Sequence, residues 1–189
     1  MLTTQYSLLN TTQMKKLSMQ ELNRLSASEF EATNKFPYVL VLDDVRSMLN
    51  VGSVFRTADA FRAEKLVLCG ITGTPPHREI AKTALGADET VTWEYAENVL
   101  LAIQQLKEQN FVICAIEQVS GSVSLIDFVP ERDKKYAFVL GNEVFGVNET
   151  VVKQADICIE IPQFGTKHSL NIAVTAGIIC WDFLKSLMI

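Results

Sequence analysis

The chain has 189 residues, and its 17 lysines and arginines against 22 aspartates and glutamates give a net charge of −5. This length suits one domain with a substantial core and is too short for two full α/β domains. Hydrophobic residues at 48% and charged residues at 21% exclude a disordered chain, and the acidic balance excludes nucleic-acid binding by bulk positive charge alone.

The sequence contains no candidate membrane span, because no apolar run approaches the ~18 residues that cross a bilayer. The N-terminal MLTTQYSLLN carries neither the positive charge nor the apolar block of a signal peptide. We therefore expect a cytoplasmic protein with no membrane contact. The 4 cysteines lie in separate apolar runs, which predicts buried, reduced thiols, and with only 2 histidines we expect no metal site.

Residues 1–36 are expected to form a polar, helical N-terminal extension, followed by the main domain over residues 37–189. The segments Ser18–Glu21 and Ser26–Glu29 both fit the capping box, in which a serine side chain and a glutamate side chain cap each other's backbone. Pro37 then breaks the helical pattern. The extension is thus an appendage of the main domain.

From Tyr38 onward, short continuous apolar runs alternate with helical stretches. The predicted strands are 38–43, 65–70, 90–93, 111–116, 136–141 and 157–162, and the predicted helices are 50–62, 96–108 and 170–188. Continuous hydrophobicity indicates strands buried on both faces, as in a parallel sheet covered by helices. We therefore predict an α/β fold whose ligand site lies beyond the carboxyl ends of the strands.

Three segments at those strand ends could carry chemistry, and the first contains Gly52 and Arg56. These two residues share the polar face of a predicted helix, where the glycine would let a ligand approach the backbone while the guanidinium holds an anion. The alternative is that Arg56 pairs with Asp59 three residues later as a solvated helix pair.

The second segment runs from Gly141 to Gly146 and places two permissive backbones around Glu143. Exposed peptide groups in such a turn can hydrogen-bond a nucleoside base. The alternative is an ordinary strand-to-helix turn in which Asn148 caps the next helix.

The third segment precedes the last helix. Ser169 could cap that helix, and the amide of Asn171 in its first turn could face a ligand. The helix itself is apolar over most of its circumference, which predicts burial on two sides, one in its own core and one in a subunit interface.

Together the three segments resemble the motifs of the SpoU (TrmH) family of RNA ribose 2′-O-methyltransferases, members of the SPOUT superfamily. The resemblance covers about residues 38–188, with the motifs in the family's order and spacing. The matching stretches are Asn50-Val-Gly52-Ser-Val-Phe-Arg56-Thr57-Ala58, Leu140-Gly141-Asn142-Glu143-Val-Phe-Gly146, and Ile161-Pro162 through Ser169-Leu170-Asn171.

This resemblance implies an α/β domain with a C-terminal trefoil knot, one of the rare exceptions to unknotted chains. It implies that S-adenosylmethionine binds in the knot, held largely by backbone groups. It also implies a homodimer formed through the C-terminal helix. The positions that match the family's cofactor contacts are Gly141, Ile161, Ser169 and Leu170, with Ile116 at a strand end nearby.

The implied chemistry is attack of a ribose 2′-hydroxyl on the cofactor's methyl group, which makes RNA the substrate, either tRNA or rRNA. A free arginine is too basic to be a good general base, so we expect Arg56 to grip a substrate phosphate and orient the hydroxyl. Asn50, Glu143, Ser169 and Asn171 match the remaining polar site residues and would position Arg56 and the ribose. Basic residues expected near this site are Arg46, Arg62, Arg78, Lys82, Lys167 and His168.

Two other interpretations stay open from the sequence. One is a non-catalytic RNA-binding or ribosome-associated module that retains the methyltransferase fold, against which the intact polar site residues argue. The other is a nicotinamide oxidoreductase, suggested by the turn Gly70–Gly73 after a predicted strand. The sequence lacks the G-x-G-x-x-G pattern of that class.

Overall fold

A computed structural model describes residues 14–18 and 20–188, and the chain divides into two units, Met1–Thr33 and Asn34–Ile189. In the first unit, α1 (Ala27–Ala32) begins with the predicted capping box at Ser26 and Glu29. The other predicted capping box, Ser18–Glu21, forms its hydrogen bonds between side chain and backbone in both directions, but only a turn follows it and no helix. The helical prediction therefore holds for residues 27–32 and is wrong for 14–18, 20–26 and 33–36, whereas residues 1–13 and 19 lie outside the described residues.

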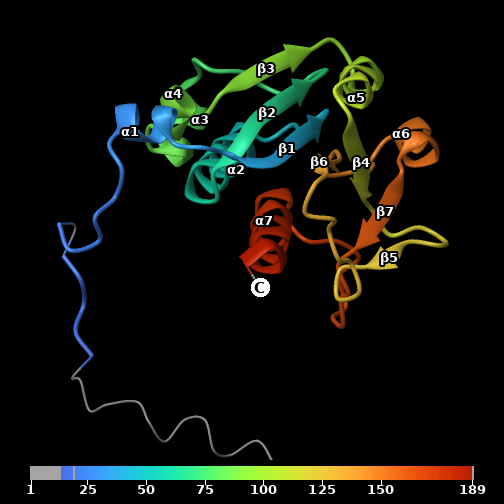
Figure 1. The fold of residues 1–189 in the computed structure, drawn as a ribbon. Coiled ribbons are helices and arrows are strands. Elements are labelled where there is room, and N and C mark those ends of the chain that lie inside the picture. Colours follow the sequence, from blue (N-terminus) through green and yellow to red (C-terminus); the bar gives the residue numbers. More distant parts are fainter. Residues whose placement is uncertain (1–13, 19, 189) are drawn as a thin grey trace, which may run out of the picture. The chain divides into compact units, whose positions relative to one another are not determined.

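The second unit contains a seven-stranded parallel sheet within the described residues, in the order β3-β2-β1-β6-β4-β7-β5 (Figure 1). The predicted parallel α/β architecture is confirmed, whereas the trefoil knot stays a prediction. The strands are β1 (Phe36–Asp43), β2 (Ala63–Cys69), β3 (Trp93–Ala96), β4 (Phe111–Ile116), β5 (Val123–Ser124), β6 (Lys135–Leu140) and β7 (Ile157–Glu160).

Two details of the strand prediction are corrected. Residues 90–92 of the predicted strand 90–93 are not in a strand, because Thr90 ends the short helix α4 (Ala87–Thr90) and β3 begins only at Trp93. As an edge strand with mostly half-buried or exposed side chains, β3 lacks the continuous apolar pattern of the buried strands. The two-residue β5 was not predicted, because a strand of that length leaves no pattern in the sequence.

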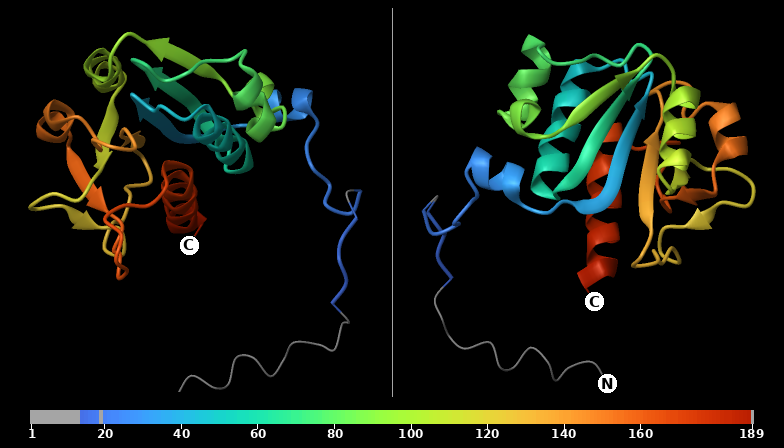
Figure 2. Two further views of the ribbon diagram at one scale, coloured as in Figure 1. Left: turned by 180° about the vertical axis from the view of Figure 1, so that it is seen from behind. Right: turned by 45° about the horizontal axis from the view of Figure 1, so that its top comes forward.

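Helices cover both faces of the sheet (Figure 2). The helices α5 (Val99–Glu108) and α6 (Glu149–Gln154) pack on one face, and α2 (Met48–Ala60) and α7 (Ile172–Met188) pack together on the other. The short α3 (Arg78–Ala84) packs against α2. The three predicted helices are confirmed within a few residues, and α6 is capped by Asn148 as expected.

Each face of the sheet has its own core, because alternate side chains of a strand point to opposite sides. Under α5 and α6 the core is mainly aliphatic and includes Val39 and Val41 of β1, with Phe111 as its one aromatic side chain among the described residues. Under α7 it is aromatic: the Phe183 ring lies 5.1 Å from the Tyr38 ring and 5.4 Å from the Phe138 ring. These contacts fix α7 on the sheet and so position the loop that precedes it.

The described cysteines are all free, with Cys158 half-buried and the other three buried. Burial raises the pKa of both Cys69 and Cys180 to about 12, so these thiols are protonated and unreactive at neutral pH. Among the residues that the structure describes, no helix is long and apolar enough to cross a bilayer.

Gly52 does not open space for a ligand, contrary to the interpretation from the sequence. It is buried in α2 against α3, where an added Cβ would lie 2.2 Å from both the carbonyl oxygen of Ile80 and Oγ1 of Thr83. The Thr83 hydroxyl also donates to the carbonyl of Leu49 at 2.9 Å. The glycine therefore allows two helices to approach closely.

We predict that Gly52→Ala destabilises the fold by roughly 1–3 kcal/mol, because the backbone of α3 must move to admit the methyl group. The measurement is the thermal unfolding midpoint, which should fall by roughly 2–4 °C for each kcal/mol in a chain of this size. Gly177→Ala is the matched control, since it is also within a helix but has no atom within 4 Å of the added Cβ. Equal midpoints for the two variants would contradict the packing role.

Candidate cofactor and substrate site

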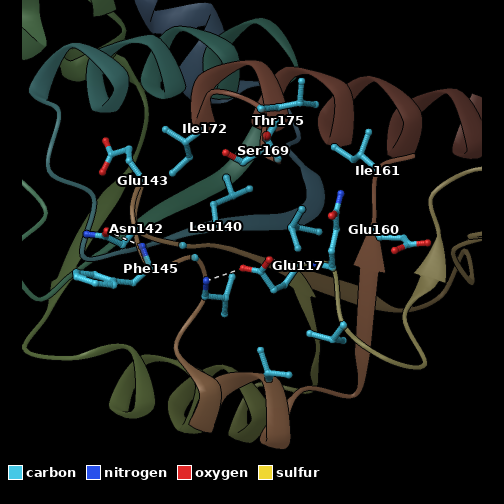
Figure 3. A pocket seen from close by; sticks show the side chains of 18 of the residues that line it. Glu117, Leu140, Asn142, Glu143, Phe145, Glu160, Ile161, Ser169, Ile172 and Thr175 are labelled. Carbon is cyan, nitrogen blue, oxygen red and sulfur yellow. Dashed lines mark hydrogen bonds between the residues drawn. The ribbon is translucent and has the colours of Figure 1, made fainter. Parts of the chain in front are cut away.

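A cavity of about 730 Å³ lies at the carboxyl end of the sheet (Figure 3). Its walls come from the segments that follow β4, β6 and β7, from the first turn of α7 and from α6. This is the edge at which parallel sheets bind ligands, and the volume falls within the usual range for small-molecule sites. Among residues 14–18 and 20–188 no group of three His, Cys, Asp or Glu side chains is placed to hold a metal ion.

The structure brings most of the predicted site residues to this cavity. All of the positions expected to contact the cofactor line it, as do three of the expected polar residues, Glu143, Ser169 and Asn171. Asn50 and Arg56 do not line it. The cofactor positions in the wall are Ile116, Gly141, Ile161, Ser169 and Leu170.

The turn after β6 is closed by its own backbone. Asn142 and Gly146 exchange backbone hydrogen bonds of 3.0 and 2.9 Å, and Oδ1 of Asn142 accepts from the backbone of Val144 at 2.8 Å. Gly146 has a φ of +69°, and a Cβ on Gly141 would lie 2.1 Å from the Gly146 carbonyl carbon. Both glycines are therefore required for the turn to close, as the sequence pattern indicated.

Glu117 supports the Gly141–Gly146 turn through a hydrogen bond, and the sequence motifs did not identify it. Its Oε2 accepts from the backbone N–H of Val147 at 2.9 Å and lies where a Cβ on Gly146 would stand. Glu117 also lines the cavity. Its position in the sequence could have identified it, because a carboxylate directly after the buried strand β4 lies at the edge of the sheet where ligand sites occur.

The three motifs are joined by hydrogen bonds that centre on Glu143. Its carboxylate accepts from the backbone N–H groups of Arg46 and Ser47 at 3.0 and 3.1 Å, and from the side-chain amide of Asn50 at 3.0 Å. Oδ1 of Asn50 in turn accepts from Nδ2 of Asn171 at 3.1 Å. The loop after β6, the start of α2 and the start of α7 are thereby connected at one edge of the cavity.

This arrangement keeps Glu143 ionised. Partial burial opposes ionisation, but the hydrogen bonds from Arg46, Ser47 and Asn50 outweigh it and hold the pKa of the Glu143 carboxyl below its usual value. A carboxylate with a lowered pKa is a weak base, so Glu143 is suited to holding partners in place rather than to removing a proton.

Asn171, and not Ser169, caps the last helix. The α7 helix begins at Ile172, and Oδ1 of Asn171 accepts from the backbone N–H of Ala173 at 2.9 Å. The capping role considered for Ser169 is therefore wrong. Its side chain is exposed and forms part of the cavity lining instead.

The loop from Ile161 to Leu170 leaves its peptide groups unused. In the part of the chain that the structure describes, no backbone N–H or C=O of residues 161–170 forms a hydrogen bond with another residue. Residues 164–170 are exposed, so the peptide groups of those that line the cavity can exchange water for a ligand with donors and acceptors of its own. A nucleoside base has such a pattern.

Arg56 is exposed on α2, outside the cavity. The alternative partner, Asp59, accepts instead from the Thr90 hydroxyl at 3.2 Å. No salt bridge to Arg56 occurs within residues 14–18 and 20–188. The Arg56–Asp59 pair is therefore not formed, and the guanidinium remains available for an anion.

The expected basic residues are only partly gathered at this site. His168 lines the cavity, and Lys153, which was not anticipated, does so as well. Arg62 does not belong to the site, because its guanidinium lies 4.8 Å from the ring centre of Phe36, the first residue of β1, at the opposite edge of the sheet. The sequence placed Arg62 at the end of the predicted helix 50–62 but did not show which edge of the sheet that end reaches.

The turn Gly70–Gly73 is occupied by the chain itself. The carboxylate of Asp44 accepts from the backbone of Ile71 at 3.0 Å, and the buried Thr72 hydroxyl donates to the carbonyl of Leu42 at 3.1 Å. A Cβ on Gly70 would lie 2.0 Å from the Asp44 carboxylate. The Gly70–Gly73 turn therefore holds the loop after β1 in place. It does not form a dinucleotide-binding turn, so the structure gives no support to the oxidoreductase interpretation.

Known proteins similar to this chain are RNA methyltransferases. The chain is 31% identical over 143 residues to the 23S rRNA (guanosine-2′-O-)-methyltransferase RlmB of Neisseria meningitidis, covering 76% of this chain and 56% of that protein. It is 28% identical over 150 residues to an uncharacterized tRNA/rRNA methyltransferase of Borreliella burgdorferi, covering 79% and 64%. The chain thus spans about three fifths of the length of these relatives.

Solved structures and a family model agree with these relatives. An AdoMet-bound rRNA methyltransferase from Sinorhizobium meliloti matches with a TM-score of 0.73 at 26% identity, over 81% of this chain and 58% of that one. The A. aeolicus TrmH/SpoU tRNA modifying enzyme shares the fold, with a TM-score of 0.74 at 24% identity over 85% and 81%. The model of the SpoU rRNA methylase family matches residues 37–181, so this chain belongs to that family.

Proposed function

We propose that this chain is an S-adenosylmethionine-dependent RNA ribose 2′-O-methyltransferase, with residues 37–189 as the catalytic domain. The observation that carries the proposal is the hydrogen-bonded chain Glu143–Asn50–Asn171, which joins all three motifs beside a cavity of suitable volume for the cofactor. Family membership supports it independently.

The cavity walls fit S-adenosylmethionine, which would supply the methyl group. The unpaired peptide groups of 161–170 suit an adenine base, and the side chains of Ile116, Ile161 and Leu170 offer apolar contact. The closed turn at Gly141 gives the wall a fixed shape, and the hydroxyl of Ser169 is free to meet a polar group. A similar structure, that of the Sinorhizobium meliloti enzyme, is described as AdoMet-bound.

The polar residues would position the methyl acceptor. Among the described residues none forms a salt bridge with Arg56, so its guanidinium can hold a phosphate of the substrate backbone through two parallel hydrogen bonds. Glu143 fixes Asn50 and the start of α2, and so sets where Arg56 projects from that helix. Most of the rate enhancement would come from alignment of the hydroxyl with the methyl group.

The substrate would be tRNA or rRNA, since the similar proteins carry those names. RNA of this kind would place the activity in the cytoplasm. The alternative is a non-catalytic RNA-binding module that retains the fold. Substitution of Arg56 distinguishes the two proposals, because it should strongly reduce methyl transfer only if the protein is an enzyme.

We also propose a homodimer that buries the outer face of α7. This helix exposes 51% of Val174 and 59% of Trp181 although its opposite side is in the core. The Trp181 ring lies 6.4 Å from that of Phe61, which follows α2, so the apolar surface extends across two elements. A second copy of the same face would cover both.

Calorimetry with S-adenosylmethionine tests the cofactor site. We expect saturable binding by the wild-type chain, with competition by S-adenosylhomocysteine, and binding weaker by roughly tenfold or more in Gly141→Ala, because its Cβ forces the turn to shift. Gly177→Ala is the control, since Gly177 lies within α7 outside the cavity lining and its added Cβ would meet nothing within 4 Å. Wild-type protein that is folded but binds no cofactor would contradict the proposal.

Arg56→Ala tests catalysis. Methyl transfer from labelled S-adenosylmethionine to RNA should fall by roughly 100-fold, because the acceptor loses its anchor, while cofactor affinity stays unchanged. Arg132→Ala, at an exposed arginine outside the cavity lining, should match the wild type. Unchanged transfer in Arg56→Ala would contradict the proposed role, and a wild type that binds RNA without methylating it would favour the binding module.

Trp181→Glu tests the dimer. A buried charge in the interface should convert the dimer to a monomer in sedimentation velocity. The control is Leu101→Glu, which places the same charge on the exposed side of α5 and should leave a dimer. A wild-type chain that sediments as a monomer would rule out this assembly.

A further inference from the structure

Phe145 is an exposed aromatic residue at the cavity, on the turn that carries Glu143. Its side chain is 85% exposed, yet the residue lines the cavity and follows Glu143 by two positions. Figure 3 shows its ring on the same side of the cavity as Asn142 and Glu143, across from Ile161. Phe164, in the third motif loop, is also exposed but does not line the cavity.

The ring projects from a turn that is already ordered. Oδ1 of Asn142 accepts from the backbone N–H of Phe145 at 3.2 Å, and the paired backbones of Asn142 and Gly146 close the turn around it. Asn142 also donates from Nδ2 to the carbonyl of Asp44 at 2.7 Å, which ties the turn to the loop after β1. Binding of a ligand against the ring therefore costs little conformational entropy, because the backbone that carries the ring is already ordered.

The proposed substrate provides a flat partner of this kind. A ribose enters a cavity most readily from a single-stranded loop, bulge or end, where the base is unstacked and its faces have no neighbours. Aromatic side chains compensate by stacking on such bases, and they accept any base because every base has a π-face. The net charge of −5 makes a contact that needs no charge valuable here.

We propose that Phe145 stacks on a nucleobase of the RNA substrate, either that of the methylated nucleotide or its immediate neighbour. The inference rests on the proposed function, because the base is brought to the turn by the ribose that is methylated. Stacking there would hold the nucleotide while Glu143, Asn50 and Arg56 fix its ribose and phosphate. Phe145 acts as a substrate-binding residue with no part in cofactor binding.

The experiment compares three substitutions of Phe145. Phe145→Tyr keeps a flat ring, Phe145→Leu keeps apolar bulk without one, and Phe145→Ala removes both. The control is Val129→Ala, which is 79% exposed and is not among the residues that line the cavity. Each variant is tested by fluorescence anisotropy with a labelled single-stranded RNA of about 12 nucleotides, at low salt.

Methyl transfer is measured in parallel on tRNA and rRNA extracted from cells that lack the gene. We expect the alanine and leucine variants to bind RNA roughly tenfold more weakly and to raise the KM for RNA, while the tyrosine variant and the control match the wild type. Calorimetric affinity for S-adenosylmethionine should be the same in all of them.

Several results would overturn the stacking contact. Wild-type RNA affinity in Phe145→Ala would do so, as would wild-type affinity in Phe145→Leu, which would show that a flat ring is not needed. Conversion of Phe145→Ala to a monomer in sedimentation, with RNA affinity per subunit unchanged, would assign the ring to the dimer instead.

Failure of the proposed function gives a different pattern. If the wild type transfers no methyl group, but the alanine and leucine variants bind RNA more weakly than the wild type, catalysis is contradicted and the stacking contact is supported. A wild type that methylates RNA with no dependence on Phe145 would contradict the stacking alone. Absence of both binding and transfer in the wild type would contradict both.

Discussion

The carboxylate of Glu143 organises the candidate site, because it accepts hydrogen bonds from the backbone of Arg46 and Ser47 and from the side chain of Asn50. The first two donors lie at the beginning of α2, where a negative charge is favoured by the unpaired N–H groups and the helix dipole. Asn171 extends the chain to α7. One ionised side chain thus fixes three segments that are up to 121 positions apart in the sequence.

That carboxylate can serve this purpose only because the turn carrying it is rigid. The turn closes through Asn142 and the two glycines that flank Glu143, and Glu117 supports it from the end of β4. The same rigidity presents Phe145 to solvent beside the cavity. A single closed turn therefore shapes the wall of the proposed cofactor site and displays the proposed contact for the substrate.

Much of this was predictable from local pattern. The continuous apolar runs identified the buried strands, since a strand covered on both faces needs no polar side, and parallel pairing then placed the motif loops at one edge. The glycines around Glu143 predicted a tight turn, which the structure confirms. Short polar elements such as α3 and β5 were missed, because their stability comes from neighbours that are distant in sequence.

The sequence by itself determined the parallel α/β fold, the three motifs and the ionisable groups available to them, because strand burial and turn chemistry are encoded by adjacent residues. Only the tertiary structure decided what each group contacts. Gly52 serves helix packing, Asn171 rather than Ser169 caps α7, and Arg62 lies at the far edge of the sheet. Such contacts join residues far apart in the chain, and their geometry exists only once the sheet and its helices have packed.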